Sequence, residues 1–124
     1  MNNLKDKLYQ KIQEHRPKII QLLEEHGDVV IDQVTVAQVI GGMRGIKSLV
    51  TDISYLDPFE GIRYRGFTLP EVLAKLPKPD GAEMPFVEGL YYLLLTGEMP
   101  TKEEVESLVV DFKNRRVVPR YVWD

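Results

Sequence analysis

The first part of the chain carries a hydrophobic pattern with the period of a helix. Apolar residues recur at intervals that keep them on one side of such a helix: Leu4, Leu8, Ile12, Ile19, Leu22 and Leu23. Pro17 lies inside this segment, lacks an amide donor and clashes with the carbonyl group four residues earlier. We therefore predict a helix that kinks or starts afresh at Pro17 and ends near Gly27, which can adopt a left-handed cap.

Three further helix starts share one sequence signature, the capping box. In each, a threonine is followed three residues later by Gln or Glu: Thr35 to Gln38, Thr68 to Glu71, and Thr101 to Glu104. The threonine hydroxyl can accept a hydrogen bond from the third helical amide, and the longer side chain can reach back to the threonine amide. The predicted helices end at Gly41-Gly42, before Pro77 and near Arg116.

A β-like segment separates the first two capping boxes. Residues 48–56 are rich in Val, Thr, Ile and Tyr, residues 57–61 form a turn sequence, and residues 62–65 alternate apolar with basic side chains. This pattern predicts one small hairpin near residues 48–65. Arg63 and Arg65 are two positions apart, so we expect them on one face of the sheet, in structural roles. Asp52, Asp57 and Glu60 are candidate ion-pair partners for them.

The most apolar segment runs from Phe86 to Thr96 and is followed by Gly97. Its apolar residues cover most of the circumference of a helix, so we expect it to be buried nearly all round. An apolar tail, residues 117–123, follows the last predicted helix. Together these patterns predict a mainly α fold of about five helices with one small β-hairpin near residues 48–65.

Composition excludes several classes of protein. The 124 residues include 16 Lys and Arg, 19 Asp and Glu, and no Cys, which gives a net charge of −3. The acidic balance argues against nucleic-acid binding, and the missing cysteines exclude disulfides and thiolate ligands. The longest apolar run, residues 90–95, is too short to cross a membrane, and the first ten residues do not resemble a targeting signal. We expect a cytoplasmic protein without a membrane partner.

Candidate chemistry is sparse. His15 and His26 are expected at an exposed helix position and at a helix end, and no residues have the spacing of metal ligands, so we predict neither a catalytic residue nor a metal site. The sequence Gly41-Gly42-Met43-Arg44-Gly45 stands out because three glycines surround one arginine. Two interpretations remain open: a helix stop that needs positive φ angles, or an exposed loop that presents the Arg44 guanidinium to a phosphate.

Taken in order, several blocks of the sequence resemble citrate synthases. The blocks are residues 33–36, residues 41–50 with Gly-Gly-Met-Arg-Gly, residues 56–67 with Glu-Gly-Ile-Arg-Tyr-Arg-Gly, residues 88–97, and Pro100-Thr101. The resemblance extends from about Leu4 to Pro119. It implies that residues 1–124 are an N-terminal fragment of the large helical domain, with the small domain and the rest of the large domain absent.

The resemblance also implies a function for the longer protein. Citrate synthases condense acetyl-CoA with oxaloacetate and water to give citrate and CoA, work as homodimers and need no prosthetic group. Their two catalytic histidines and catalytic aspartate lie in motifs that this chain does not contain, so the fragment alone should be inactive. Arg44 matches an arginine that helps to bind a phosphate of CoA. Expected partners are the rest of the chain, a second subunit and the small-molecule substrates.

Three alternatives follow from the same residues. A segment of 2-methylcitrate synthase, which uses propionyl-CoA, would look the same because nothing here contacts the acyl pocket. A stand-alone helical interaction module could use the apolar helix and tail to bind another protein. RNA binding through Arg115, Arg116 and Arg120 is disfavoured, because the chain is acidic and has no row of interleaved aromatic residues for stacking.

Overall fold

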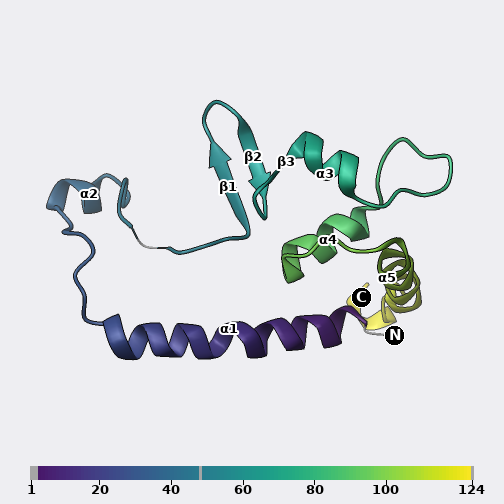
Figure 1. Cartoon of the computed structure of the whole chain (residues 1–124), viewed down its shortest axis with the longest axis horizontal. Coiled ribbons are helices and arrows are strands. Elements are labelled where there is room, and N and C mark those ends of the chain that lie inside the picture. The colour runs from purple at the N-terminus through teal and green to yellow at the C-terminus, as the bar shows by residue number, and fades with distance from the viewer. Residues whose placement is uncertain (1–2, 48, 124) are drawn as a thin grey trace. The chain divides into compact units, whose positions relative to one another are not determined.

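A computed structural model describes residues 3–47 and 49–123. They form five α-helices, three short strands and one 3-10 turn, in the order α1 (Leu4–His26), α2 (Val36–Ile40), β1 (Ser54–Asp57), β2 (Gly61–Tyr64), β3 (Phe67–Thr68), α3 (Leu69–Lys75), α4 (Val87–Thr96), α5 (Lys102–Arg115) and η1 (Arg120–Val122) (Figure 1). The predicted mainly α class with about five helices is confirmed. The chain divides into two compact units, residues 1–11 with 52–124, and residues 12–51.

Helix α1 continues through Pro17, so the predicted fresh start at that residue is wrong. The proline leaves the Gln13 carbonyl without its usual amide donor, but Gln13 is exposed and water can serve in its place. The helix ends at His26 as predicted. The left-handed cap at Gly27 is not formed, since Gly27 has no positive φ; its amide instead donates to the Leu23 carbonyl at 2.9 Å.

All three predicted capping boxes are present. Helices α2, α3 and α5 begin directly after their capping residues, Thr35, Thr68 and Thr101, and both reciprocal hydrogen bonds form in each box. The three helices end within two residues of the predicted stops. Local sequence therefore determines where these helices start, because each box satisfies amides that the first helical turn leaves without partners.

The β region begins later in the sequence than predicted and contains one more strand at its end. Strand β1 begins only at Ser54, and Ser48 lies outside the described residues. Strands β1 and β2 pair antiparallel, with Tyr55 opposite Arg63, and a third strand, β3, pairs with β2. The turn between β2 and β3 is Arg65-Gly66, with φ of 49° and 85°. Two consecutive positive φ angles make a tight hairpin that matches the twist of the strands.

A small core lies where α3 packs near α4. Val72, Leu76 and Leu93 form its centre, and Tyr64, Phe67, Leu90 and Met99 pack around it. A Cβ added at Gly89 would lie 3.4 Å from the Leu76 side chain and 3.5 Å from that of Val105, which is ordinary van der Waals contact, so this position of α4 faces both side chains.

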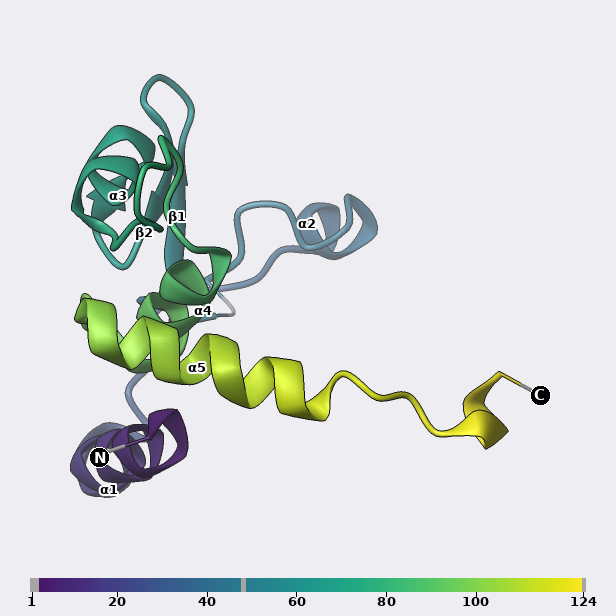
Figure 2. The ribbon, with the colours of Figure 1, turned by 90° about the vertical axis from the view of Figure 1, so that its right-hand side faces the viewer.

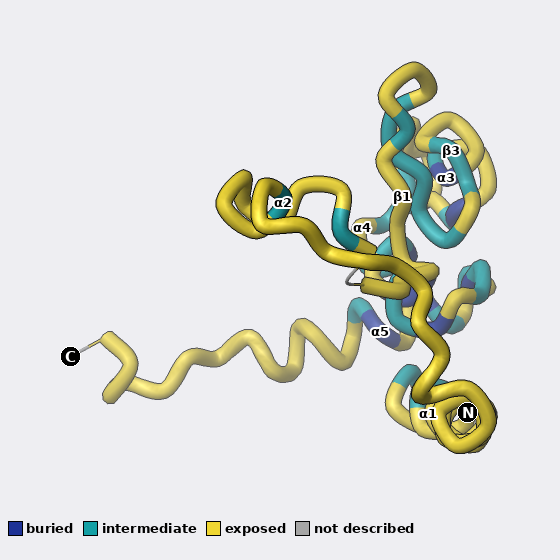
Figure 3. The backbone as a smooth tube through the Cα atoms, turned by 90° about the vertical axis from the view of Figure 1, so that its left-hand side faces the viewer, coloured by how far each residue is buried: buried dark blue, intermediate teal, exposed yellow. Residues whose placement is uncertain are grey.

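Helix α4 is only partly buried, which corrects the prediction of burial nearly all round. Four of its residues are buried: Gly89, Tyr92, Leu93 and Thr96. Tyr91 and Val87 are 45% and 79% exposed. The apolar circumference of α4 is therefore larger than the surface that the other described residues cover, as the colouring of the chain by burial shows (Figure 3).

Helix α5 is buried through Val105 and Leu108 near its start and is exposed towards its end. The apolar tail that follows it runs out from the end of the helix (Figure 2). Val117, Tyr121 and Trp123 are each at least 76% exposed. Among the described residues, no helix is both long enough and apolar enough to cross a membrane.

Candidate functional site

The Gly41–Gly45 loop follows α2 directly. The amide of Gly41 donates to the Ala37 carbonyl, and the amide of Met43 donates to the Gln38 carbonyl at 2.8 Å, so the loop closes tightly on the short helix. Gly42, Met43 and Gly45 have φ of 80°, 60° and 74°. Glycine adopts such angles at no steric cost, whereas Met43 must be held there by its neighbours. The predicted helix stop with positive φ is confirmed.

Arg44 lies at the exposed side of this loop. Among the described residues, its guanidinium has no hydrogen-bond or ion-pair partner. Its five N–H donors are thus available to an external acceptor, and their planar fork matches the geometry of a phosphate. Lys47, three residues further on, lies 3.8 Å from Asp32. The two interpretations of this loop are compatible, because the same loop ends α2 and holds the exposed Arg44.

Arg63 is held by its own hairpin. Its Nε and Nη2 donate to the Glu60 carboxylate at 3.0 and 2.5 Å, and its Nη1 donates to the Gly66 carbonyl at 3.0 Å. The hydrogen bond to Glu60 raises the pKa of Arg63 above its ordinary value. At the other end of the turn, backbone amides of Glu60 and Phe59 donate to Asp57 and lower its pKa. This arginine therefore serves the hairpin, as predicted.

Arg65 is also structural, but it does not share a face with Arg63. The strand alternation that would place the two together ends at Tyr64, and Arg65 belongs to the turn. Its Nε and Nη2 donate to the Leu94 carbonyl at 3.0 and 2.6 Å, and its Nη1 lies 2.7 Å from Asp52. Arg65 thus caps the C-terminal end of α4, where carbonyl groups lack helical donors. Of the three expected ion-pair partners, Glu60 pairs with Arg63 and Asp52 pairs with Arg65. Asp57 instead accepts hydrogen bonds from the backbone amides of Phe59 and Glu60.

A cavity of about 500 Å³ lies between the start of α1, helix α4 and helix α5. Its apolar wall includes Leu4, Leu8 and Leu95, together with the rings of Tyr91 and Phe112, which meet edge to face at 5.4 Å. No sequence pattern predicted this cavity. The regular spacing of Leu4 and Leu8 was a signal for packing, but no pattern indicated that their neighbours would leave a space.

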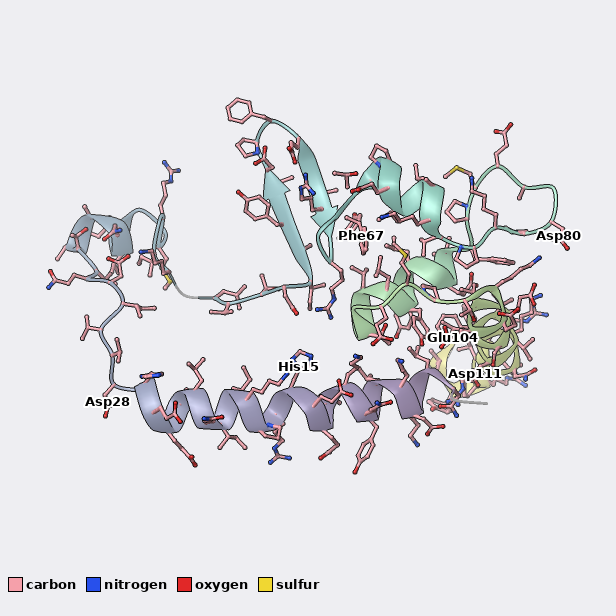
Figure 4. All side chains as sticks on the ribbon, viewed as in Figure 1. His15, Asp28, Phe67, Asp80, Glu104 and Asp111 are labelled. Carbon is pink, nitrogen blue, oxygen red and sulfur yellow. The ribbon has the colours of Figure 1, made fainter. Side chains whose placement is uncertain are left out.

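Two pairs of polar side chains in this cavity are hydrogen-bonded to each other. The Tyr92 hydroxyl donates to Glu104 at 2.8 Å, and burial, followed by this hydrogen bond, raises the pKa of Tyr92. Glu104 also completes the capping box of α5. Asp111 accepts a hydrogen bond from Arg115 at 2.9 Å. Figure 4 labels Glu104 and Asp111, both on α5. The cavity therefore combines an apolar wall with polar side chains, of which Tyr92, Glu104, Asp111 and Arg115 are already hydrogen-bonded.

The two histidines lie where they were expected. His15 is exposed on α1 (Figure 4), and His26 is the last residue of that helix, 3.8 Å from Glu25. Within the described ranges there is no cluster of three or more His, Asp or Glu side chains that could hold a metal ion.

Comparison with known proteins identifies the family. Residues 42–124 match the family described as "Citrate synthase, C-terminal domain". The chain is 46% identical over 122 residues to citrate synthase 4, mitochondrial, of Arabidopsis thaliana, and 46% identical over 119 residues to mitochondrial citrate synthase of Neurospora crassa. It is also 46% identical over 121 residues to mitochondrial 2-methylcitrate synthase of Yarrowia lipolytica.

These alignments cover 98%, 96% and 98% of the chain respectively, and they include the Gly41–Gly45 loop. The chain belongs to the citrate synthase family. It spans about a quarter of the length of these relatives, 26%, 25% and 26%. Its assignment to the N-terminal part of the large domain stays a prediction.

Proposed function

We propose that this chain is a segment of an acyltransferase that condenses acetyl-CoA with oxaloacetate and water to give citrate and CoA, a step of the tricarboxylic acid cycle. Family membership supports the proposal, and so do the names of two of the relatives. We also propose that the longer protein is a homodimer. Cytoplasmic location remains our prediction for it, although the three relatives are named as mitochondrial.

Arg44 is the residue of this chain that supports the proposed function. Its exposed and unpaired guanidinium stands on a loop fixed by three positive φ angles, and we propose that it binds a phosphate of CoA. A charge-assisted hydrogen bond of this kind contributes about 1.5–3 kcal/mol. This is too little to hold CoA without further contacts, because even millimolar binding needs about 4 kcal/mol. Since the motifs that carry the two catalytic histidines and the catalytic aspartate of citrate synthases are not in this sequence, we also propose that the 124-residue chain alone is inactive.

The test uses the full-length protein that contains this segment. Arg44→Ala should raise the KM for acetyl-CoA by roughly tenfold to a hundredfold and change the KM for oxaloacetate much less. Arg16→Ala, which removes an exposed arginine from α1, is the matched control and should leave both values unchanged. Equal increases for both substrates would contradict a phosphate contact and indicate that Arg44 supports folding.

A second candidate is a 2-methylcitrate synthase, supported by the Yarrowia lipolytica relative, whose identity equals that of the two citrate synthases. The same CoA group would occupy the Arg44 site in both enzymes. Comparing kcat/KM for acetyl-CoA and propionyl-CoA with oxaloacetate decides between them. A higher value for propionyl-CoA would overturn the citrate synthase assignment but leave the role of Arg44 intact.

A further inference from the structure

The cavity between the start of α1, α4 and α5 is formed within a single compact unit, since all of its lining residues belong to the unit that contains α4 and α5. Its volume of about 500 Å³ is in the range of sites that hold small ligands. Two of its lining residues, Tyr92 and Leu108, are only 2% and 5% exposed, whereas Tyr91 and Phe112 are 45% and 38% exposed. The cavity therefore extends from buried side chains to the surface.

Two ion pairs hold the start of α1 beside this cavity. The Nζ atoms of Lys7 and Lys11 lie 2.7 and 2.5 Å from the carboxylate oxygens of Glu98, which follows the C-cap of α4. None of these three residues lines the cavity, but they fix the helical turns that supply Leu4 and Leu8 to its wall. The space is therefore maintained by contacts that a ligand in it would not have to break.

Lys5 is the cation of this cavity that has no carboxylate partner. The described lining residues include two cations, Lys5 and Arg115, and Arg115 donates a hydrogen bond to Asp111 at 2.9 Å. Among the described residues, the Lys5 side chain has neither a hydrogen bond nor an ion pair. It lies in the first turn of α1, where the helix dipole also favours an anion, and the acidic residue of that turn, Asp6, does not line the cavity.

The two acidic side chains of the cavity, labelled in Figure 4, already have donors of their own. Glu104 accepts hydrogen bonds from the Tyr92 hydroxyl and from the Thr101 amide, both at 2.8 Å. It stands at the start of α5, where the helix dipole stabilises a negative charge. Asp111 is paired with Arg115. The charge of Lys5 is therefore left for an anion from outside.

The remaining lining residues indicate the rest of the ligand. Ser107 and Asn114 line the same cavity, and within the described part of the chain their side chains have no hydrogen-bond partner. Each can donate to a carboxylate oxygen. Leu8, Leu95 and Phe112 supply apolar surface that a hydrocarbon would cover. A small inorganic anion would leave this wall bare, and a neutral hydrocarbon would leave Lys5 unused.

We propose that this cavity binds a monocarboxylate with an apolar body, its carboxylate at Lys5 and its body against Leu8, Leu95 and Phe112. The site is distinct from Arg44, which belongs to the other compact unit. The proposal does not depend on the reaction proposed above.

Titration of the 15N-labelled 124-residue chain with octanoate, up to about 10 mM, tests the site by NMR. The amide signals of Leu8, Leu95 and Phe112 should shift together and saturate, with a dissociation constant of about 1 mM or lower. Octylammonium has the same body with the opposite charge and should bind at least about tenfold more weakly. Acetate has the charge without the body and should not saturate the signals.

Substitution of Lys5 tests the charge. Lys5→Ala should raise the dissociation constant for octanoate by roughly tenfold or more. Lys18→Ala, which removes an exposed lysine of the same helix that does not line the cavity, is the matched control and should leave it unchanged. Lys5→Glu should reverse the preference, so that octylammonium binds more tightly than octanoate. Far-UV circular dichroism checks that each variant keeps its helices.

Octanoate that produces no saturable shifts in this range would overturn the proposal. Saturable shifts confined to residues that do not line the cavity would overturn it as well, because the ligand would then bind elsewhere. Equal affinity for octylammonium and octanoate would reject recognition of a carboxylate, and an unchanged dissociation constant in Lys5→Ala would reject Lys5 as its partner. None of these outcomes bears on Arg44 or on the proposed reaction.

Discussion

Replacing Arg65 with alanine should lower the free energy of unfolding by about 2–4 kcal/mol. The side chain is 15% exposed and donates two hydrogen bonds to the Leu94 carbonyl. Hydrogen bonds from a charged donor contribute about 1.5–3 kcal/mol. The ion pair with Asp52, whose side chain is 78% exposed, adds no more than about 1 kcal/mol. Most of the expected loss of stability therefore comes from the hydrogen bonds to the Leu94 carbonyl at the end of α4.

The backbone of Arg65 allows this side-chain contribution to be separated. Its φ of 49° is unfavourable for alanine as well as for arginine, so Arg65→Ala keeps that cost. Arg65→Gly removes the same side chain but relieves about 1 kcal/mol of backbone strain. The glycine variant should therefore be more stable than the alanine variant by about that amount.

Arg63→Ala is the matched control, since it removes the same chemical group two residues away. The Arg63 side chain is 34% exposed, against 15% for Arg65, and among the described residues it contacts only Glu60 and the Gly66 carbonyl of its own hairpin, so its loss should cost less, about 1 kcal/mol. Urea unfolding followed by circular dichroism at 222 nm measures both variants, provided that the slope m stays constant. If the two alanine variants lost equal stability, capping of α4 by Arg65 would be refuted.

Three further predictions concern the same unit. Thr101→Ala should cost about 1 kcal/mol, measured by urea unfolding, because the first turn of α5 loses its cap. Gly97→Ala should cost about 1 kcal/mol in the same assay, because its φ is 76°. Hydrogen bonds from Lys11 and Lys7 lower the pKa of Glu98 below its ordinary 4.5, so its contribution is present above that pH and is lost as the pH falls through the lowered pKa. Glu98→Gln should reduce the loss of stability in acid, seen as a flatter plot of the urea midpoint against pH.

Helix starts were the most predictable feature of the fold. A capping box satisfies its hydrogen bonds within four residues, so the sequence around Thr35, Thr68 and Thr101 is sufficient to determine the boundary. The stop of α4 at Gly97 was equally local, since a left-handed residue there closes the helix. Neither feature depends on contacts with residues distant in the sequence.

Features that depend on distant residues were predicted less well. Residues 49–53 have β-forming side chains but are not in a strand, because strand formation needs a partner. Strand β3 has two residues, too few to show alternation, and the Arg65-Gly66 turn that creates it has no common hairpin sequence. The role of Arg65 depends on a carbonyl 29 residues away, which spacing cannot reveal. The same limit applies to the cavity beside α4 and α5.

Three arginines differ in how many of their hydrogen-bond donors the fold uses, and this difference bears on the proposed site. An arginine has five N–H groups. Arg63 uses all three of its nitrogens on Glu60 and Gly66, and Arg65 uses all three on Leu94 and Asp52. Arg44 donates no hydrogen bond from its guanidinium to the described residues. All three lie in motifs that resemble the family, but only Arg44 has a guanidinium left for an anion from outside. The loop around Arg44 is closed by backbone hydrogen bonds, so its guanidinium is not needed to hold the loop.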